Sequence, residues 1–198
     1  MKTQKTDLTP EERAAIIKQI DAVVVGCLND TGRAGIQNLT KHIKDIGFFT
    51  APSSRKYHSA YEGGLARHSF DVLQEMYRLT KRLKVTIPED NMIIAALLHD
   101  VCKAGAYIKT GDTYDRNPDH PKGHAQLSLS IIKEFIELTP IEEAMIKYHM
   151  GVWGTIEHSS SRGEYTLKDL TTALNAHPEV KIMCMADDIA SLMEAAGK

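Results

Sequence analysis

The dipeptide His99-Asp100 ends a long apolar run and is the strongest signal of chemistry in the chain. Residues 92–98 are apolar at every position, so a helix built from them is predicted to be buried. An isolated buried carboxylate is costly unless it is paired, hydrogen-bonded or bound to a metal. Candidate partners for this pair occur elsewhere in the chain, namely His68, His124, His149 and Asp187.

Imidazole and carboxylate groups without a thiolate suit iron, manganese, nickel, cobalt or zinc. Four histidines and two aspartates are more than one catalytic ion with open positions requires, and they suit two ions that share a carboxylate. Helical bundles commonly build such sites from side chains that project inward from several helices. The sequence therefore predicts a site for two divalent ions inside a helical protein.

Helix signals dominate the segments that must position these residues. Thr9-Pro10-Glu11-Glu12 and Thr139-Pro140-Ile141-Glu142 each combine an N-cap threonine, an early proline and a glutamate that closes a capping box. The second start predicts a helix to about His149, with Gly151 just beyond it. Further helices are predicted over residues 39–46, 64–83, 88–100, 124–138, 166–175 and 178–195, with a small β-hairpin over 106–115.

Length and composition fit a single all-α domain of 198 residues, 42% of them hydrophobic and 25% charged. We expect residues 1–56 to form an N-terminal helical extension that packs on a core of residues 57–198. The chain has three widely spaced cysteines and begins without an apolar signal region, so a cytoplasmic protein is expected. No apolar run approaches the roughly 20 residues that span a bilayer, so no membrane contact is expected, and the oligomeric state stays open.

The order of the six candidate ligands resembles the HD-domain superfamily of metal-dependent phosphohydrolases. Residues 58–69 resemble the H-x-x-Y-x-G-G-L-x-x-H-[ST] opening block of a bacterial and phage branch of that superfamily. Residues 95–103 resemble its A-L-L-H-D-x-x-K block, residues 122–124 its G-H block and residues 146–151 its H-M-G block. The resemblance covers roughly residues 57 to 190 and implies the HD-domain helical bundle as the fold.

The resemblance also implies a division of the ligands between two ions. One ion would be held by His68, His99, Asp100 and Asp187, and the second by His124, His149 and a bridging Asp100. Asp188 competes with Asp187, although Ala186-Asp187 matches the family block better. Alternatives stay open for two histidines: His124 could simply begin a helix, and His149 could be a cation at a helix C-terminus. Arg67 and Cys102 depart from the usual blocks without removing a ligand.

The implied reaction is hydrolysis of a phosphate ester or diester by a metal-bridging hydroxide. Asp100 would act as the shared catalytic ligand, and Lys103 would place positive charge near a phosphate oxygen, unless it is a surface lysine. His58 and Arg55 are candidate substrate contacts. A structural hydrogen bond for His58 and a solvated loop charge for Arg55 remain alternatives, and a solvated charge is favoured for Lys56, Arg116 and Lys122.

The expected substrate is a nucleotide or another small phosphorylated compound. The net charge of -2 argues against a strongly basic surface for nucleic acid. One alternative is an exonuclease-like phosphodiesterase on single-stranded nucleic acid. Such an enzyme needs a basic track with aromatic side chains that stack on bases, and the low aromatic content of 6% gives it only slight support. Another is a non-catalytic metal- or nucleotide-binding module, which is disfavoured because every ligand position is filled. Tyr107 and Trp153 could stack on a base, although packing in or beside the core is favoured.

Overall fold

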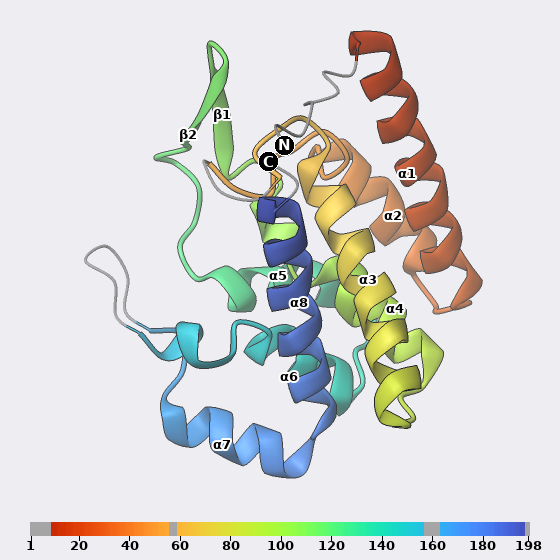
Figure 1. Cartoon of the computed structure of the whole chain (residues 1–198), viewed down its shortest axis with the longest axis vertical. Helices are drawn as coiled ribbons and strands as arrows, with labels where there is room; N and C mark the ends of the chain where they lie inside the picture. Colours follow the sequence, from red (N-terminus) through yellow and green to blue (C-terminus); the bar gives the residue numbers. More distant parts are fainter. Residues whose placement is uncertain (1–8, 56–58, 157–162, 197–198) are drawn as a thin grey trace, which may run out of the picture.

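The computed structural model describes residues 9–55, 59–156 and 163–196, and these residues form a bundle of helices with one small hairpin (Figure 1). The elements are α1 (Pro10–Asp30), α2 (Ile36–Asp45), α3 (Gly64–Leu83), α4 (Glu89–Leu98), η1 (Val101–Lys103), β1 (Tyr107–Thr110), β2 (Thr113–Arg116), α5 (His124–Lys133), α6 (Pro140–Tyr148), η2 (Gly151–Thr155), α7 (Leu167–Ala176) and α8 (Glu179–Ala196). The expected all-α class with a small β-hairpin is therefore confirmed.

Helices α1, α6 and α7 begin where their sequences predict, because each start carries a complete capping box. The hydroxyl of Thr139 accepts the backbone N–H of Glu142, whose carboxylate accepts the backbone N–H of Thr139 at 2.7 Å. The same reciprocal pair joins Thr9 to Glu12 at the start of α1. These bonds satisfy donors that the first turn of a helix leaves without an intrahelical partner.

The apolar helix α4 lies at the centre of the bundle. All of its residues from Asn91 to Leu98 are buried, as the continuous apolar run predicts. It packs against α3 and α6, and α3 packs along α8, so the segments that carry the candidate ligands surround one core. Helix α4 ends at Leu98, two residues before the predicted end, because Asp100 leaves the helical conformation and starts the short turn η1.

The N-terminal helices share the core of the rest of the chain. Val24 of α1 and Leu39 of α2 are fully buried in the same apolar cluster as the residues of α3, α4 and α6. Arg33, between α1 and α2, makes two hydrogen bonds to the carboxylate of Glu142 and one to the carbonyl of Glu137. Residues 9–55 are thus packed on the remainder of the described chain, while the division of the chain at residue 57 stays a prediction.

Helix α5 ends at Lys133, five residues before its predicted end, and α2 begins at Ile36, three residues earlier than predicted. A close contact joins these two boundaries, because Gly35 precedes α2 and Phe135 follows α5. Gly35 has φ +86°, and a Cβ atom there would lie 2.0 Å from the carbonyl oxygen of Phe135. A glycine can adopt this backbone and leave that space, so a tertiary contact sets these helix ends.

The hairpin is the two-stranded antiparallel sheet of β1 and β2, in which Tyr107 pairs with Arg116 and Thr110 with Thr113. Gly111 in its two-residue turn has φ +62°, the positive φ that the first turn position of a II′ hairpin needs. Among the described residues, no helix is both long and apolar enough to cross a membrane.

Candidate metal centre

Five separate elements bring the six candidate ligands together at the centre of the bundle. His68 lies on α3 and Asp187 on α8, while His99 and Asp100 follow directly after α4. His124 is the first residue of α5, and His149 caps the C-terminus of α6. Their ligand atoms form three overlapping groups, in each of which all atoms lie within 4.8 Å of one another.

One oxygen of Asp100 faces the first pair of histidines. Oδ2 of Asp100 lies 3.4 Å from Nε2 of His99 and 4.0 Å from Nε2 of His68. Oδ1 of Asp187 lies 3.0 Å from the same nitrogen of His68 and 3.9 Å from Nε2 of His99. These four residues are the set that the resemblance to the HD-domain superfamily assigns to one ion.

The other oxygen of Asp100 faces the second pair of histidines. Oδ1 of Asp100 lies 2.7 Å from Nε2 of His124 and 3.6 Å from Nε2 of His149. The two imidazole nitrogens lie 3.2 Å apart. The carboxylate of Asp100 therefore stands between two groups of ligand atoms, as a bridging ligand would.

Backbone carbonyls orient two of the imidazoles toward the centre. Nδ1 of His99 lies 2.9 Å from the carbonyl oxygen of Ala96, and Nδ1 of His149 lies 2.8 Å from that of Ile146. A carbonyl oxygen only accepts hydrogen bonds, so Nδ1 carries the proton in both rings and Nε2 presents a lone pair to the cluster. This arrangement is typical of histidines that bind metals through Nε2.

The cluster also contains buried polar atoms without a hydrogen bond. Nε2 of His99 and Oδ1 of Asp100 are buried without a hydrogen bond among the described residues, although Oδ1 lies 2.7 Å from Nε2 of His124 as an ion pair. Buried lone pairs that face one another are costly unless a cation lies among them. The residues present therefore fit divalent metal ions, although these atoms do not identify the metal.

Burial and neighbouring charges shift the pKa values of these groups in opposite directions. Burial by itself raises the pKa of the Asp100 carboxyl, but the Lys103 ammonium and the imidazoles of His99 and His124 hold it well below its ordinary value. Burial and the neighbouring His99 lower the pKa of His149 to about 3. Burial also disfavours charged His124, but the Asp100 carboxylate outweighs it and raises that pKa to about 10.

Two residues that the sequence does not single out as site residues position His124. The carboxylate of Glu164 accepts the backbone N–H groups of His124 and Ala125, both at 2.7 Å, and so caps the start of α5. The sulfur of Cys102 lies 3.2 Å from Nδ1 of His124. Glu164 lies 40 positions from His124, so no local spacing could reveal it.

The predicted auxiliary residues have different positions. Lys103 forms an ion pair with Oδ2 of Asp100 at 2.5 Å, so its ammonium is engaged within the cluster. Both Lys103 and Arg55 line a pocket of about 460 Å³ beside His124. The prediction for His58 falls outside the described residues. Asp188 is exposed and does not belong to the cluster, so the geometry favours Asp187 over it.

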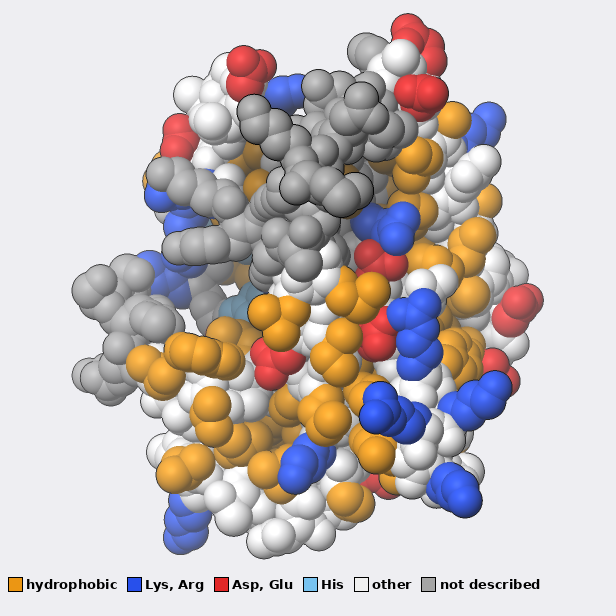
Figure 2. Space-filling view, in the orientation of Figure 1, with side chains coloured by type: hydrophobic (Ala, Val, Ile, Leu, Met, Phe, Trp, Pro, Cys, Tyr) orange, Lys and Arg blue, Asp and Glu red, His pale blue; other side chains and the backbone are white. Residues whose placement is uncertain are grey.

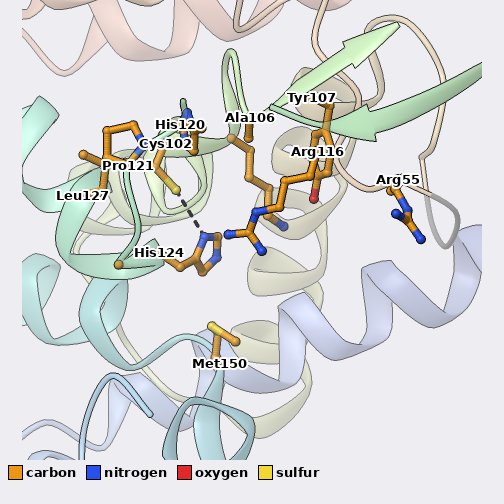
Figure 3. A pocket seen from close by; sticks show the side chains of 12 residues that line it. Arg55, Cys102, Ala106, Tyr107, Arg116, His120, Pro121, His124, Leu127 and Met150 are labelled. Atoms are coloured by element: carbon orange, nitrogen blue, oxygen red, sulfur yellow. Dashed lines mark hydrogen bonds between the residues drawn. The ribbon is translucent and has the colours of Figure 1, made fainter. Parts of the chain in front are cut away.

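The two candidate stacking residues lie in different surroundings. Tyr107 is half-buried and lines the pocket beside His124 (Figure 3). Trp153 on η2 is 58% exposed and does not line that pocket. Hydrophobic side chains gather on the face over η2, α7 and α8 (Figure 2).

Comparisons with known proteins agree with this geometry. The HD domain family matches residues 65–192 of the chain. The chain is also similar to a dihydroneopterin 2′,3′-cyclic phosphate phosphodiesterase from Methanocaldococcus jannaschii, with 34% identity over 128 residues. That similarity covers 57% of this chain and 45% of the relative, so this chain spans less than half the length of the curated protein it matches.

No solved structure matches the chain significantly. The opening block at residues 58–69 begins before the region that the family matches, so membership of the bacterial and phage branch stays a prediction. The family match covers well over half of the chain and includes all six residues of the cluster. The chain therefore belongs to the HD-domain family, the superfamily of metal-dependent phosphohydrolases that its motifs resemble.

Proposed function

We propose that this protein is a binuclear phosphohydrolase that cleaves a small phosphate ester or diester, such as a nucleotide. The observation that carries the proposal is the position of Asp100. Its Oδ2 lies among the first pair of histidines, and its Oδ1 lies 2.7 Å from Nε2 of His124 in the second. A single-ion site would not need two pairs of histidines on opposite oxygens of one carboxylate.

In this proposal His68, His99, Asp100 and Asp187 hold one ion, while His124, His149 and the shared Asp100 hold the other. Two divalent ions, when bound, activate water at neutral pH and neutralise charge on a phosphoryl group. Asp100 contributes an ionised carboxylate, since its neighbours hold its pKa well below the ordinary value. The carbonyls behind His99 and His149 fix their rings, so that little reorganisation is needed to bind cations.

Exposure and the pocket together support an approach of the substrate from the side of His124. The side chains of His68, His99, Asp100 and His149 are at most 2% exposed, whereas those of Asp187 and His124 are 19% and 23% exposed. The pocket of about 460 Å³ is lined by His124 and Lys103 but not by Asp187. A substrate phosphate in this pocket would contact the cluster at its accessible edge, with the Lys103 ammonium adding positive charge.

The similar archaeal protein supports phosphodiesters as a substrate class. That protein is a phosphodiesterase of dihydroneopterin 2′,3′-cyclic phosphate. This chain spans 45% of that protein, so the likeness suggests a class of bond and not a particular compound. We therefore include cyclic phosphodiesters of nucleotide size among the candidate substrates.

The test is a hydrolysis screen of manganese-loaded protein on nucleoside monophosphates, 2′,3′-cyclic nucleotides and short oligonucleotides, with metal content measured in parallel. Asp100→Ala should abolish turnover and reduce bound metal, because it removes the shared ligand. Asp188→Ala is the matched control, since Asp188 follows Asp187 but is exposed outside the cluster, and it should retain both. Turnover at the wild-type rate in Asp100→Ala would contradict the proposal, and turnover of oligonucleotides alone would favour the exonuclease-like alternative.

A further inference from the structure

The pocket beside His124 has a lining that suits an anionic ligand with an apolar part. Its residues are Arg55, Cys102, Lys103, Ala106, Tyr107, Arg116, His120, Pro121, Gly123, His124, Leu127 and Met150. No Asp or Glu is among these described residues, whereas two arginines and a lysine are. A volume of about 460 Å³ falls within the roughly 300–1,000 Å³ typical of small-molecule sites and exceeds what a lone phosphate needs.

Of the cationic groups in the pocket, Arg116 has a charge that is available to a ligand. The Lys103 ammonium is paired with the carboxylate of Asp100. Within the described ranges no carboxylate forms an ion pair with Arg116, the last residue of β2. Figure 3 shows its guanidinium extending into the pocket toward His124, while Arg55 lies at the far side. A guanidinium without a counter-charge in a concave site is suited to bidentate binding of phosphate.

The base of the hairpin fixes Arg116 relative to the metal centre. The backbone N–H of Ala106 donates to the carbonyl of Lys103 at 3.0 Å, only a few residues after the ligand Asp100. On the other strand, the backbone N–H of Asn117 donates to Ala106 and its side-chain amide donates to Gly105. The Asn117 bonds join the second strand to Gly105 and Ala106, and the Ala106 bond joins that segment to η1, so the position of Arg116 is linked to that of the His99-Asp100 segment.

The partner of Arg116 across the hairpin supplies an aromatic surface. Tyr107 and Arg116 are directly opposite in the register, so both side chains lie on the same face of the hairpin. Leu127 and Met150 add apolar surface from α5 and from the segment after α6. A flat heterocyclic group could lie against this wall while its phosphate reaches the guanidinium and the accessible side of His124.

We propose that Arg116 is a substrate-binding residue that recognises the phosphate of a nucleotide-like ligand, whose ring system packs against Tyr107 and the apolar wall. This inference rests on the proposed function for the presence of a phosphate at the centre. It makes the hairpin a specificity-determining element and assigns a ligand to Arg116, an exposed residue that lies on a strand and lines the pocket, where the sequence favours a solvated charge.

The experiment is calorimetric titration of metal-loaded protein with two probes. One is a methylene-phosphonate analogue of adenosine monophosphate, which a hydrolase cannot cleave, and the other is adenosine. Arg116→Ala should weaken binding of the phosphonate on the order of 10–100-fold, the effect of losing a hydrogen-bonded charged partner, with little change for adenosine. Arg116→Lys should restore only part of the affinity, because an ammonium lacks the planar fork.

Lys109→Ala is the matched control, since it removes an exposed positive charge from the same hairpin outside the pocket lining. It should bind the phosphonate as the wild type does, and all variants should keep the wild-type metal content. Equal phosphonate affinity in Arg116→Ala and wild type would overturn the inference, as would a wild type that does not bind the probe. If the wild type hydrolyses phosphate esters and Arg116→Ala leaves its KM unchanged, the proposed function stands and the role of Arg116 is refuted. If binding of the phosphonate depends on Arg116 but the protein shows no metal-dependent hydrolysis, the role of Arg116 stands and the proposed function is refuted.

Discussion

Replacing Glu164 with alanine should loosen the start of α5 and, with it, the position of His124. The carboxylate of Glu164 accepts two adjacent backbone N–H groups, those of His124 and Ala125, at 2.7 Å each. Gly123, the residue before the helix, has no side chain that could accept them in its place. In the alanine variant both donors would have to find water, although His124 is half-buried and Ala125 is buried.

The size of the effect follows from these two bonds. Each hydrogen bond to a charged group contributes about 1.5–3 kcal/mol net, and a negative charge at a helix N-terminus adds about 0.3–1 kcal/mol. Because Glu164 is half-buried, water offsets part of the loss, so we expect a destabilisation of about 2–3 kcal/mol. For a chain of this length that corresponds to a fall in Tm of roughly 5–10 °C.

The assay is thermal unfolding of wild type and Glu164→Ala, followed by circular dichroism in the same buffer. Glu134→Ala is the matched control, because Glu134 is an exposed glutamate at the other end of the same helix, and its Tm should change little. Metal affinity should fall by about 10-fold or more in Glu164→Ala, since a displaced His124 is a poorer ligand. A Tm within about 2 °C of the wild type would refute the capping role of Glu164.

Three further outcomes follow from the structure. Glu142→Ala should lower the free energy of unfolding by about 3 kcal/mol in denaturant titration, because it leaves the half-buried Arg33 without its carboxylate partner, and an unchanged midpoint would contradict this. Manganese at about 100 times its dissociation constant should stabilise the wild type by about 2.7 kcal/mol and should raise its Tm. The same addition should leave the Tm of Asp100→Ala unchanged, and an equal rise in both would count against Asp100 as a ligand. Hydrogen bonds from the backbone N–H and hydroxyl of Thr166 lower the pKa of Asp169, so this carboxylate stabilises the fold above its unfolded pKa and loses that contribution as the pH falls. Asp169→Asn should therefore show a flatter dependence of stability on pH between about pH 5 and 3 than the wild type, and identical slopes would show that the cap does not act through its charge.

Local sequence signals predicted the helices that carry the ligands, because those signals act within one turn. The capping box at Thr139 sets the start of α6, and the helix then reaches His149 at its C-terminus as predicted. The apolar run before His99 predicted a buried helix, and α4 is buried from Asn91 to Leu98. The hairpin turn at Gly111 was likewise readable from the glycine and its flanking residues.

Long-range contacts could not be predicted in the same way. The end of α5 depends on the approach of Gly35 to Phe135, which are distant in sequence. Glu164 reaches His124 across 40 positions, and Arg116 enters the pocket because Asn117 closes the hairpin on Ala106. Residue type and spacing could indicate which side chains bind metal, but only the packed fold shows what orients them.

If Asp100 bridges two metal ions, anomalous diffraction from crystals of the manganese-loaded protein should show two peaks about 3.5–4 Å apart. One should lie beside Oδ2 of Asp100 with His68 and His99, and the other beside Oδ1 with His124 and His149. A single peak at full occupancy, or peaks away from both oxygens of Asp100, would contradict this bridging role.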